Sequence, residues 1–359
     1  MERKLNQTTK QIMIYGANGY TGELIAKEAI EKGYQPILAG RNQAQIEKLA
    51  TELNLTYRVF PLTFENQIIE NLNDIHLVIH CAGPFSATAE PMMQACIKSK
   101  THYTDITGEI GVFELAQSLN QRAKEAGIVI CPGVGFDVIP TDCLASLLKE
   151  KMPDATHLAL GFDSGSSMSP GTAKTSIEGV ASGGRVRKDG VITQVPLAFK
   201  ERQIDFGNGS KNAVTIPWGD VSTAYHSTGI PNIEVYIPVS PKGVKNMRKM
   251  NWFRWLVKFK FVQNKMKQQI EKTAKGPNES QREKLRTFLW GEVTNDAGDK
   301  LVGRIETCNG YQLTYIAAVE VAKFLLENEV EGGAYTPSKL ISNQMIFDVP
   351  TTGEVSFSV

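Results

Sequence analysis

Three glycines near the start of the chain are spaced GxxGxxG, which departs by one residue from the GxGxxG fingerprint of a dinucleotide-binding turn. Gly16, Gly19 and Gly22 follow a short apolar run, residues 12–15, and open a stretch whose apolar side chains fall on one broad helical face. Glycine permits backbone angles and close approaches that a side chain would forbid. A pyrophosphate can therefore bind at the helix N-terminus, where free N–H groups and the helix dipole favour an anion. We expect dinucleotide contacts from Gly16, Asn18, Gly19, Tyr20, Thr21 and Gly22.

The residues that follow the second predicted strand indicate which dinucleotide binds. An acidic residue about 20 positions after the glycines would bond the ribose hydroxyls of NAD. Arg41 and Asn42 stand there instead. A guanidinium cannot accept a hydrogen bond from a hydroxyl, but it can pair in a fork with a 2′-phosphate. The sequence thus predicts NADP(H) as the cofactor; the alternative is that Arg41 is a solvated residue at a helix start.

A nicotinamide enzyme usually needs a proton donor as well, and three carboxylates are the candidates. Asp105 and Glu109 lie at the end of the fifth predicted strand, and Asp137 follows the sixth. Each side chain could act as an acid or a base, but helix capping and structural roles explain them equally well. Histidines and cysteines without metal-ligand spacing predict that no metal is bound.

These residues need a scaffold, and the first half of the chain alternates short apolar runs with helical stretches. Predicted strands cover residues 12–15, 35–40, 56–60, 76–82, 102–106 and 128–131. Strands separated by helices form a doubly wound parallel α/β sheet, with strand order 3-2-1-4-5-6. A ligand binds such a sheet at the carboxyl ends of the strands, between the first and the fourth. A helix is expected over residues 111–126.

Composition bounds the class of protein. The chain has 359 residues, enough for two domains, and 39 basic against 38 acidic side chains, so no global charge indicates nucleic acid as a partner. Five scattered cysteines, the lack of an apolar leader and the lack of a long apolar window predict a reduced, cytoplasmic protein.

Five motifs resemble the saccharopine dehydrogenase-like oxidoreductases. They are GANGYTGELIA at 16–26, LAGRN at 38–42, CAGPF at 81–85, THYTDITGE at 101–109 and GFDVIPTD at 135–142. They are most similar to the branch that contains bacterial trans-acting enoyl reductases and their animal relatives. The resemblance implies an NADP-dependent oxidoreductase with a Rossmann domain, in which Ala82, Gly83 and Pro84 line the nicotinamide ribose.

The second half predicts a different domain. Alternating strands, a hairpin at 188–190 and a long hairpin over 285–309 indicate an α+β domain on a mixed or antiparallel sheet. We assign residues 1–150 to the Rossmann domain and 151–310 to a substrate or dimerisation domain. The resemblance implies that a helix at 311–328 returns to the first domain, which residues 311–359 would complete.

Residues 242–275 form a basic aromatic segment. It contains eleven Lys or Arg and one acid, with aromatic and aliphatic side chains at helical spacing, among them Trp252, Trp255 and Phe259. Three interpretations remain open. The segment could contact a membrane surface, close as a lid over an apolar site, or pack on its own domain or a dimer partner with a solvated basic face.

The sequence favours an NADPH-dependent reductase of an enoyl, carbonyl or imine acceptor, which can be lipid-linked. A saccharopine-type imine reductase is one alternative, and it would need Arg185, Arg187 and Arg202 to converge on carboxylates. The other is a non-catalytic, nucleotide-binding, membrane-associated protein. Expected partners are a small-molecule or lipid-linked substrate, a membrane surface and a second copy of the chain; the expected location is cytoplasmic, peripheral to a membrane.

Overall fold

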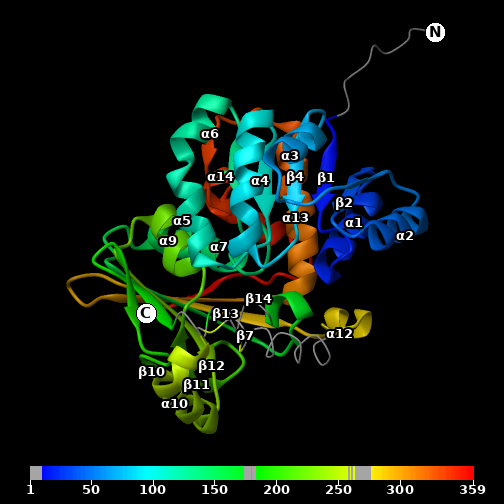
Figure 1. Cartoon of the computed structure of the whole chain (residues 1–359). Coiled ribbons are helices and arrows are strands. Elements are labelled where there is room, and N and C mark those ends of the chain that lie inside the picture. The colour runs from blue at the N-terminus through cyan, green and yellow to red at the C-terminus, as the bar shows by residue number, and fades with distance from the viewer. Residues whose placement is uncertain (1–9, 174–178, 180–182, 258, 260–261, 263–275) are drawn as a thin grey trace.

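The computed structural model describes residues 10–173, 179, 183–257, 259, 262 and 276–359. Figure 1 shows that the chain forms two sheets, one above the other in this view. The first sheet, with helices on both faces, forms the upper half of the view. The second sheet forms the lower half, and α7 and α9 lie at the junction. The predicted fold class is therefore confirmed.

The first sheet is entirely parallel, with the order β15-β6-β5-β4-β1-β2-β3. Its strands are β1 (Ile12–Tyr15), β2 (Ile37–Gly40), β3 (Tyr57–Val59), β4 (Leu77–His80), β5 (His102–Asp105), β6 (Val129–Cys131) and β15 (Gly333–Ala334). The predicted order of six strands is confirmed. β15 is a seventh strand that the sequence did not predict, because two residues are too short to show a periodic pattern.

The helices that cover this sheet differ from the sequence prediction at one place. They are α1 (Tyr20–Glu31), α2 (Gln43–Leu53), α3 (Glu65–Leu72), α4 (Phe85–Ser99), α5 (Ile110–Ser118), α6 (Asn120–Ala126) and α7 (Ile139–Lys151). The predicted single helix over 111–126 is wrong: it is α5 and α6, separated at Leu119, whose ψ of 0° departs from helical geometry. Apolar spacing continues through both helices, so periodicity alone does not reveal the break.

The second sheet is mixed. Its main path is β10-β11-β12-β7-β13-β14-β16, and β8 pairs with β12 and β9. The strands are β7 (His157–Ser164), β8 (Gly184–Lys188), β9 (Val191–Val195), β10 (Glu201–Asp205), β11 (Ser210–Ile216), β12 (Asn232–Pro238), β13 (Thr287–Thr294), β14 (Lys300–Thr307) and β16 (Ser356–Ser358). β12 and β7 are parallel, and the other strand pairs of this sheet are antiparallel. The helices of this half are α9 (Asp220–Thr228), α10 (Pro241–Val257) and α12 (Glu279–Lys284).

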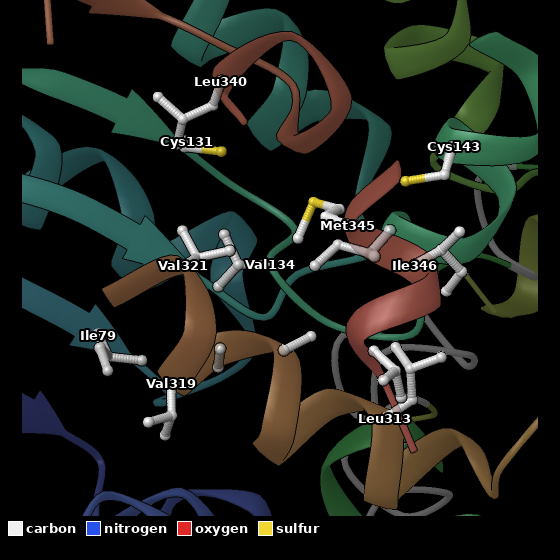
Figure 2. Packing of buried hydrophobic residues seen from close by; sticks show 14 of the residues in the cluster. Ile79, Cys131, Val134, Cys143, Leu313, Val319, Val321, Leu340, Met345 and Ile346 are labelled. Carbon is white, nitrogen blue, oxygen red and sulfur yellow. The ribbon is translucent and has the colours of Figure 1, made fainter. Parts of the chain in front are cut away.

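The last part of the chain contacts both sheets. α13 (Gly310–Glu327) packs against α1, and β15 pairs with β6 at the edge of the first sheet. After α14 (Pro337–Leu340) and the 3₁₀ helix η1 (Asn343–Asp348), β16 pairs instead with β14 of the second sheet. Figure 2 shows Leu313 and Val319 of α13 in the same core as Met345 of η1.

α7 joins the two halves through close packing. A Cβ added at Gly291 of β13 would lie 2.6 Å from Leu148 Cδ1, and one at Gly303 of β14 would lie 3.0 Å from Leu144 Cδ1. The two glycines thus let α7 lie directly on the second sheet, with its leucines buried. Within the described ranges, no helix is long and apolar enough to cross a membrane.

Candidate functional site

The glycine turn lies where the strand order reverses, between β1 and β4. Gly16 has a φ of +83°, and a Cβ there would lie 2.7 Å from the backbone nitrogen of Ala82. A Cβ at Gly22 would overlap the carbonyl oxygen of Gly16 and lie 2.9 Å from Ala17 Cα. The loop after β1 is therefore closed tightly over the first turn of α1 and against the loop after β4. This is the place at which an open α/β sheet binds its ligand.

The N-terminus of α1 is available to an anion. Its N-cap, Gly19, has no side chain to satisfy the N–H groups of the first turn, which belongs to Tyr20, Thr21 and Gly22. Gly19 itself donates to the carbonyl oxygen of Gly16 at 3.0 Å. An uncapped 12-residue helix behind a glycine cradle fits the pyrophosphate of a dinucleotide.

Arg41 stands exposed at the end of β2, beside this turn. Among the residues that the structure describes, its guanidinium has no hydrogen-bond or ion-pair partner, so it is free to pair with a phosphate. Its charge is close enough to Tyr15 to oppose the rise in the pKa of that phenol, which burial takes to about 12. This position suits the 2′-phosphate that distinguishes NADP from NAD.

Three other predicted cofactor residues have side chains engaged within the protein. The Asn42 side chain caps α2 by accepting from Gln45 N–H, and Asn18 donates to the Gln45 side chain at 2.7 Å. The Tyr20 hydroxyl donates to the carbonyl oxygen of Pro277. Asn42 and Tyr20 would therefore reach the cofactor through backbone atoms, while Gly83 and Pro84 lie in the loop after β4, next to Ala82.

Asp105 holds two strand ends together. It is fully buried at the end of β5 and accepts hydrogen bonds from the Tyr103 hydroxyl at 2.7 Å and from the N–H groups of Thr107 and Gly133 at 2.9 Å. Burial raises the pKa of this carboxyl to about 7, although the three donors oppose the rise. Its oxygens are all engaged, which indicates a structural role.

We expect Asp105→Asn to lower the free energy of unfolding by roughly 2–3 kcal/mol, because an amide nitrogen would face a buried donor and leave it unpaired. Tyr103→Phe removes one donor without such a clash, so it should cost about 1 kcal/mol. Urea unfolding followed by circular dichroism measures both values. Equal stability of Asp105→Asn and wild type would contradict the structural role.

Glu109 caps a helix. Its carboxylate accepts from the N–H of Phe85 at 2.9 Å and of Ser86 at 2.7 Å, the first two residues of α4. A carboxylate at a helix N-terminus satisfies free N–H groups and complements the helix dipole. Of the two roles open for Glu109, the geometry therefore matches capping.

Asp137 differs from both. No described residue forms a hydrogen bond or ion pair with its side chain, and its Oδ2 lies 2.7 Å from the point where a Cβ at Gly108 would be. The carboxyl thus reaches the loop after β5 from the loop after β6. Burial, together with the charge of Glu109, raises its pKa to about 7. A carboxyl that is half protonated near neutrality and has no internal partner can exchange a proton with a ligand.

An aromatic wall, defined as Phe136, Phe162 and Trp218, lies beside Asp137. Trp218 Nε1 donates to the carbonyl oxygen of Asp137 at 2.9 Å. The ring centroids of Phe162 and Trp218 are 4.8 Å apart, and those of Phe136 and Phe162 are 5.3 Å apart. The second half of the chain thus contributes aromatic side chains next to the backbone of Asp137, the one candidate carboxylate residue whose side chain has no described partner. No pattern in the sequence indicates this contact, because Phe162 and Trp218 are distant in the chain from Asp137.

The arginines that an amino-acid adduct would need are engaged elsewhere. Arg187 is buried and donates to Val221 O, to Gly190 O and to the Glu114 carboxylate. Arg202 forms a two-point pair with Glu292, at 3.1 and 2.8 Å. Neither guanidinium is available to a substrate carboxylate.

Comparison with known proteins agrees with this geometry. Residues 12–131 match the saccharopine dehydrogenase NADP binding domain. The human "saccharopine dehydrogenase-like oxidoreductase" is 24% identical over 97% of this chain and 96% of its own length. The "lipid droplet localized protein" of Caenorhabditis elegans is 23% identical over 94% of this chain and 95% of its own.

Two further proteins are informative, one about the similarity to trans-acting enoyl reductases and one about the fold. A "trans-acting enoyl reductase" of Mycobacterium bovis (strain BCG / Pasteur 1173P2) is 28% identical, but over only 40% of this chain and 37% of its own length. The structure of apo saccharopine dehydrogenase (L-Glu forming) from Saccharomyces cerevisiae superposes with a TM-score of 0.64 at 12% identity, covering 98% of this chain and 100% of that one. The predicted resemblance and the predicted cofactor, NADP, are confirmed.

Proposed function

We propose that this chain, an NADP-dependent oxidoreductase of the saccharopine dehydrogenase-like type, reduces an apolar enoyl or carbonyl acceptor and uses Asp137 as the proton donor. The observation that carries the proposal is the Asp137 carboxyl, which has no described internal partner and lies beside the aromatic wall. The cofactor supplies a hydride when bound.

The residues that would hold the cofactor are the glycine turn with the N-terminus of α1, Arg41, and the loop containing Ala82, Gly83 and Pro84. The turn and the helix would bind the pyrophosphate, and Arg41 the 2′-phosphate. Glu109 caps the start of α4, directly after the loop that contains Ala82, Gly83 and Pro84.

Reduction adds a hydride to an electron-poor carbon and a proton to the atom on which negative charge develops. With a pKa of about 7, Asp137 carries a proton in about half of the molecules at neutral pH. Burial favours the protonated form of this carboxyl near neutral pH. The carboxyl regains its proton from solvent after each turnover.

The wall favours an unsaturated apolar acceptor over an amino-acid adduct. Two of the three arginines that an adduct with charged carboxylates would need, Arg187 and Arg202, are already paired with Glu114 and Glu292. The names of two relatives agree with the proposal: the M. bovis protein is an enoyl reductase, and the C. elegans protein is localized to lipid droplets. The imine-reductase alternative has no comparable support.

Arg41→Ala should weaken NADPH binding by about 10- to 100-fold and leave NADH binding nearly unchanged, because the variant loses a charge-assisted contact that only NADPH can make. Titration of each nucleotide by fluorescence measures the two dissociation constants. Lys48→Ala, which removes an exposed cation from the neighbouring α2, is the matched control and should affect neither. Equal preference of Arg41→Ala and wild type for NADPH would contradict the assignment.

Turnover tests the whole proposal. NADPH oxidation is followed with a panel of medium- and long-chain enoyl thioesters, ketones and amino-acid imines. We expect oxidation with the apolar acceptors and a lower rate with the imines. Tight NADPH binding without oxidation by any acceptor would instead favour the non-catalytic alternative.

A further inference from the structure

α10 is attached to the second sheet by one side only. Val244 is buried against Ala198 and Val214, and Met247 packs against the same cluster. Asn251 continues this side: its amide accepts from Leu197 N–H at 2.8 Å and donates to Leu197 O at 3.2 Å. Val244, Met247 and Asn251 follow the i, i+3, i+7 spacing of one helical face. Among the side chains of α10 that the structure describes, those of Lys242, Lys245 and Lys249 are exposed.

Three large aromatic side chains at the end of α10 are exposed. Trp252 is 83% exposed, Phe253 62% and Trp255 60%. Exposed large aromatics that cluster on one short segment mark an interaction site rather than ordinary surface. In the described part of the segment, α10 packs on its own sheet through Val244 and Met247, while these three aromatic side chains are exposed. The sequence pattern placed the aromatic side chains and the lysines on opposite faces, whereas in the described part of α10 Trp252 lies on the same side as Lys242, Lys245 and Lys249.

The exposed face is also cationic. Lys242, Lys245 and Lys249 are exposed and precede Trp252 at i, i+3, i+7 and i+10, so all four lie along one side. The pair between Arg248 and Glu201 lies beside them. The described first turn of α10 has no acid to offset these charges. Residues 258, 260–261 and 263–275 of the predicted segment lie outside the described residues.

We propose that the outer face of α10, defined as Lys242, Lys245, Lys249, Trp252 and Phe253, docks on an anionic lipid surface together with Trp255, which is exposed near the end of the helix. Tryptophan and phenylalanine enter the interface between head groups and acyl chains, while lysines remain among the lipid phosphates. Charge complementarity selects an anionic surface over a neutral one.

A second copy of the chain fits this face less well. A two-fold dimer places the same patch against itself, so the lysines of one copy would meet those of the other without an acid to pair with. The position of α10 also suits a surface contact. It lies at the far end of the second sheet from the first sheet, so docking leaves the nucleotide turn accessible (Figure 1).

The test uses the full chain and vesicles of phosphatidylcholine with or without phosphatidylserine. Wild type should float with the anionic vesicles, more weakly as salt is raised, and its tryptophan emission should shift to shorter wavelength. Two triple variants should each lower the bound fraction at least tenfold. The aromatic variant combines Trp252→Ala, Phe253→Ala and Trp255→Ala. The charge variant combines Lys242→Glu, Lys245→Glu and Lys249→Glu. Phe64→Ala, which removes an aromatic side chain that is 67% exposed on the first half, is the matched control and should bind like wild type.

Two results would overturn the proposal. One is equal binding of the aromatic variant and wild type. The other is no vesicle binding by wild type together with a dimer that the aromatic variant converts to a monomer, which would assign the face to a second copy. NADPH titration shows that each variant is folded, and it is independent of acceptor reduction, so failure here leaves the proposed function standing.

Discussion

Asp137→Asn is expected to lower kcat for acceptor reduction by roughly 10²- to 10⁴-fold, the range that a positioned general acid contributes. Asparagine has nearly the same shape but cannot transfer a proton. Because the side chain has no described internal partner, its replacement breaks no hydrogen bond, and both stability and NADPH affinity should be close to those of wild type. Stopped-flow and steady-state assays of NADPH oxidation measure the effect.

The pH dependence of the reduction rate also tests the role of Asp137 as proton donor. Asp137 must be protonated to donate, and its pKa is raised to about 7, so the wild-type reduction rate should fall as pH rises through about 7. Asp137→Asn should remove this fall. Asp105→Asn is the matched control, since burial raises the pKa of Asp105 to the same range. That variant should be less stable yet retain the pH dependence. An Asp137→Asn enzyme with wild-type kcat and pH profile would show that the proton comes from elsewhere.

The second large effect is expected at Gly22. A Cβ there would overlap Gly16 O, so Gly22→Ala must move the turn away from α1. Overpacking of this kind costs about 1–3 kcal/mol of unfolding free energy. A displacement of about 1 Å at a binding turn can weaken a precisely placed contact about 10²-fold, and we expect a loss of that size in NADPH affinity.

Gly111→Ala is the control for Gly22→Ala. Gly111 also lies in the first turn of a helix, α5, but a Cβ there meets nothing within 4 Å. Alanine should be tolerated and slightly stabilising at that position. Thermal unfolding with and without NADPH compares the two variants. A Gly22→Ala protein that NADPH stabilises as strongly as wild type would contradict the role of the turn.

The parts of this molecule that the sequence predicts are those whose signal is local. The strands β1, β2 and β4 are short apolar runs that are fully buried, and the glycine turn with Arg41 lies within about 30 residues of sequence. Each of these features can therefore be predicted from one short stretch of sequence. β15 escapes prediction because it is stabilised by its neighbour β6 rather than by its own pattern.

The roles of the three candidate carboxylates could not be told apart from the local sequence. Asp105, Glu109 and Asp137 have similar settings in the sequence, each near the end of a predicted strand. Their roles separate only through contacts between elements: Asp105 meets Gly133, and Glu109 meets the start of α4. Asp137 is left without a described partner, beside Trp218 from the other half of the chain. Such long-range contacts leave no periodic trace.

Because the end of the chain returns to the first sheet, the nucleotide half cannot be completed until late in synthesis. β6 gains its outer neighbour only with residues 333–334, and α1 is covered by α13, residues 310–327. A ribosome that has released residues 1–150 has therefore produced a nucleotide half with an open sheet edge and an uncovered helix. Such an edge invites pairing with other chains. The nucleotide half should thus mature late in synthesis, and a fragment ending near residue 150 should aggregate rather than bind NADPH.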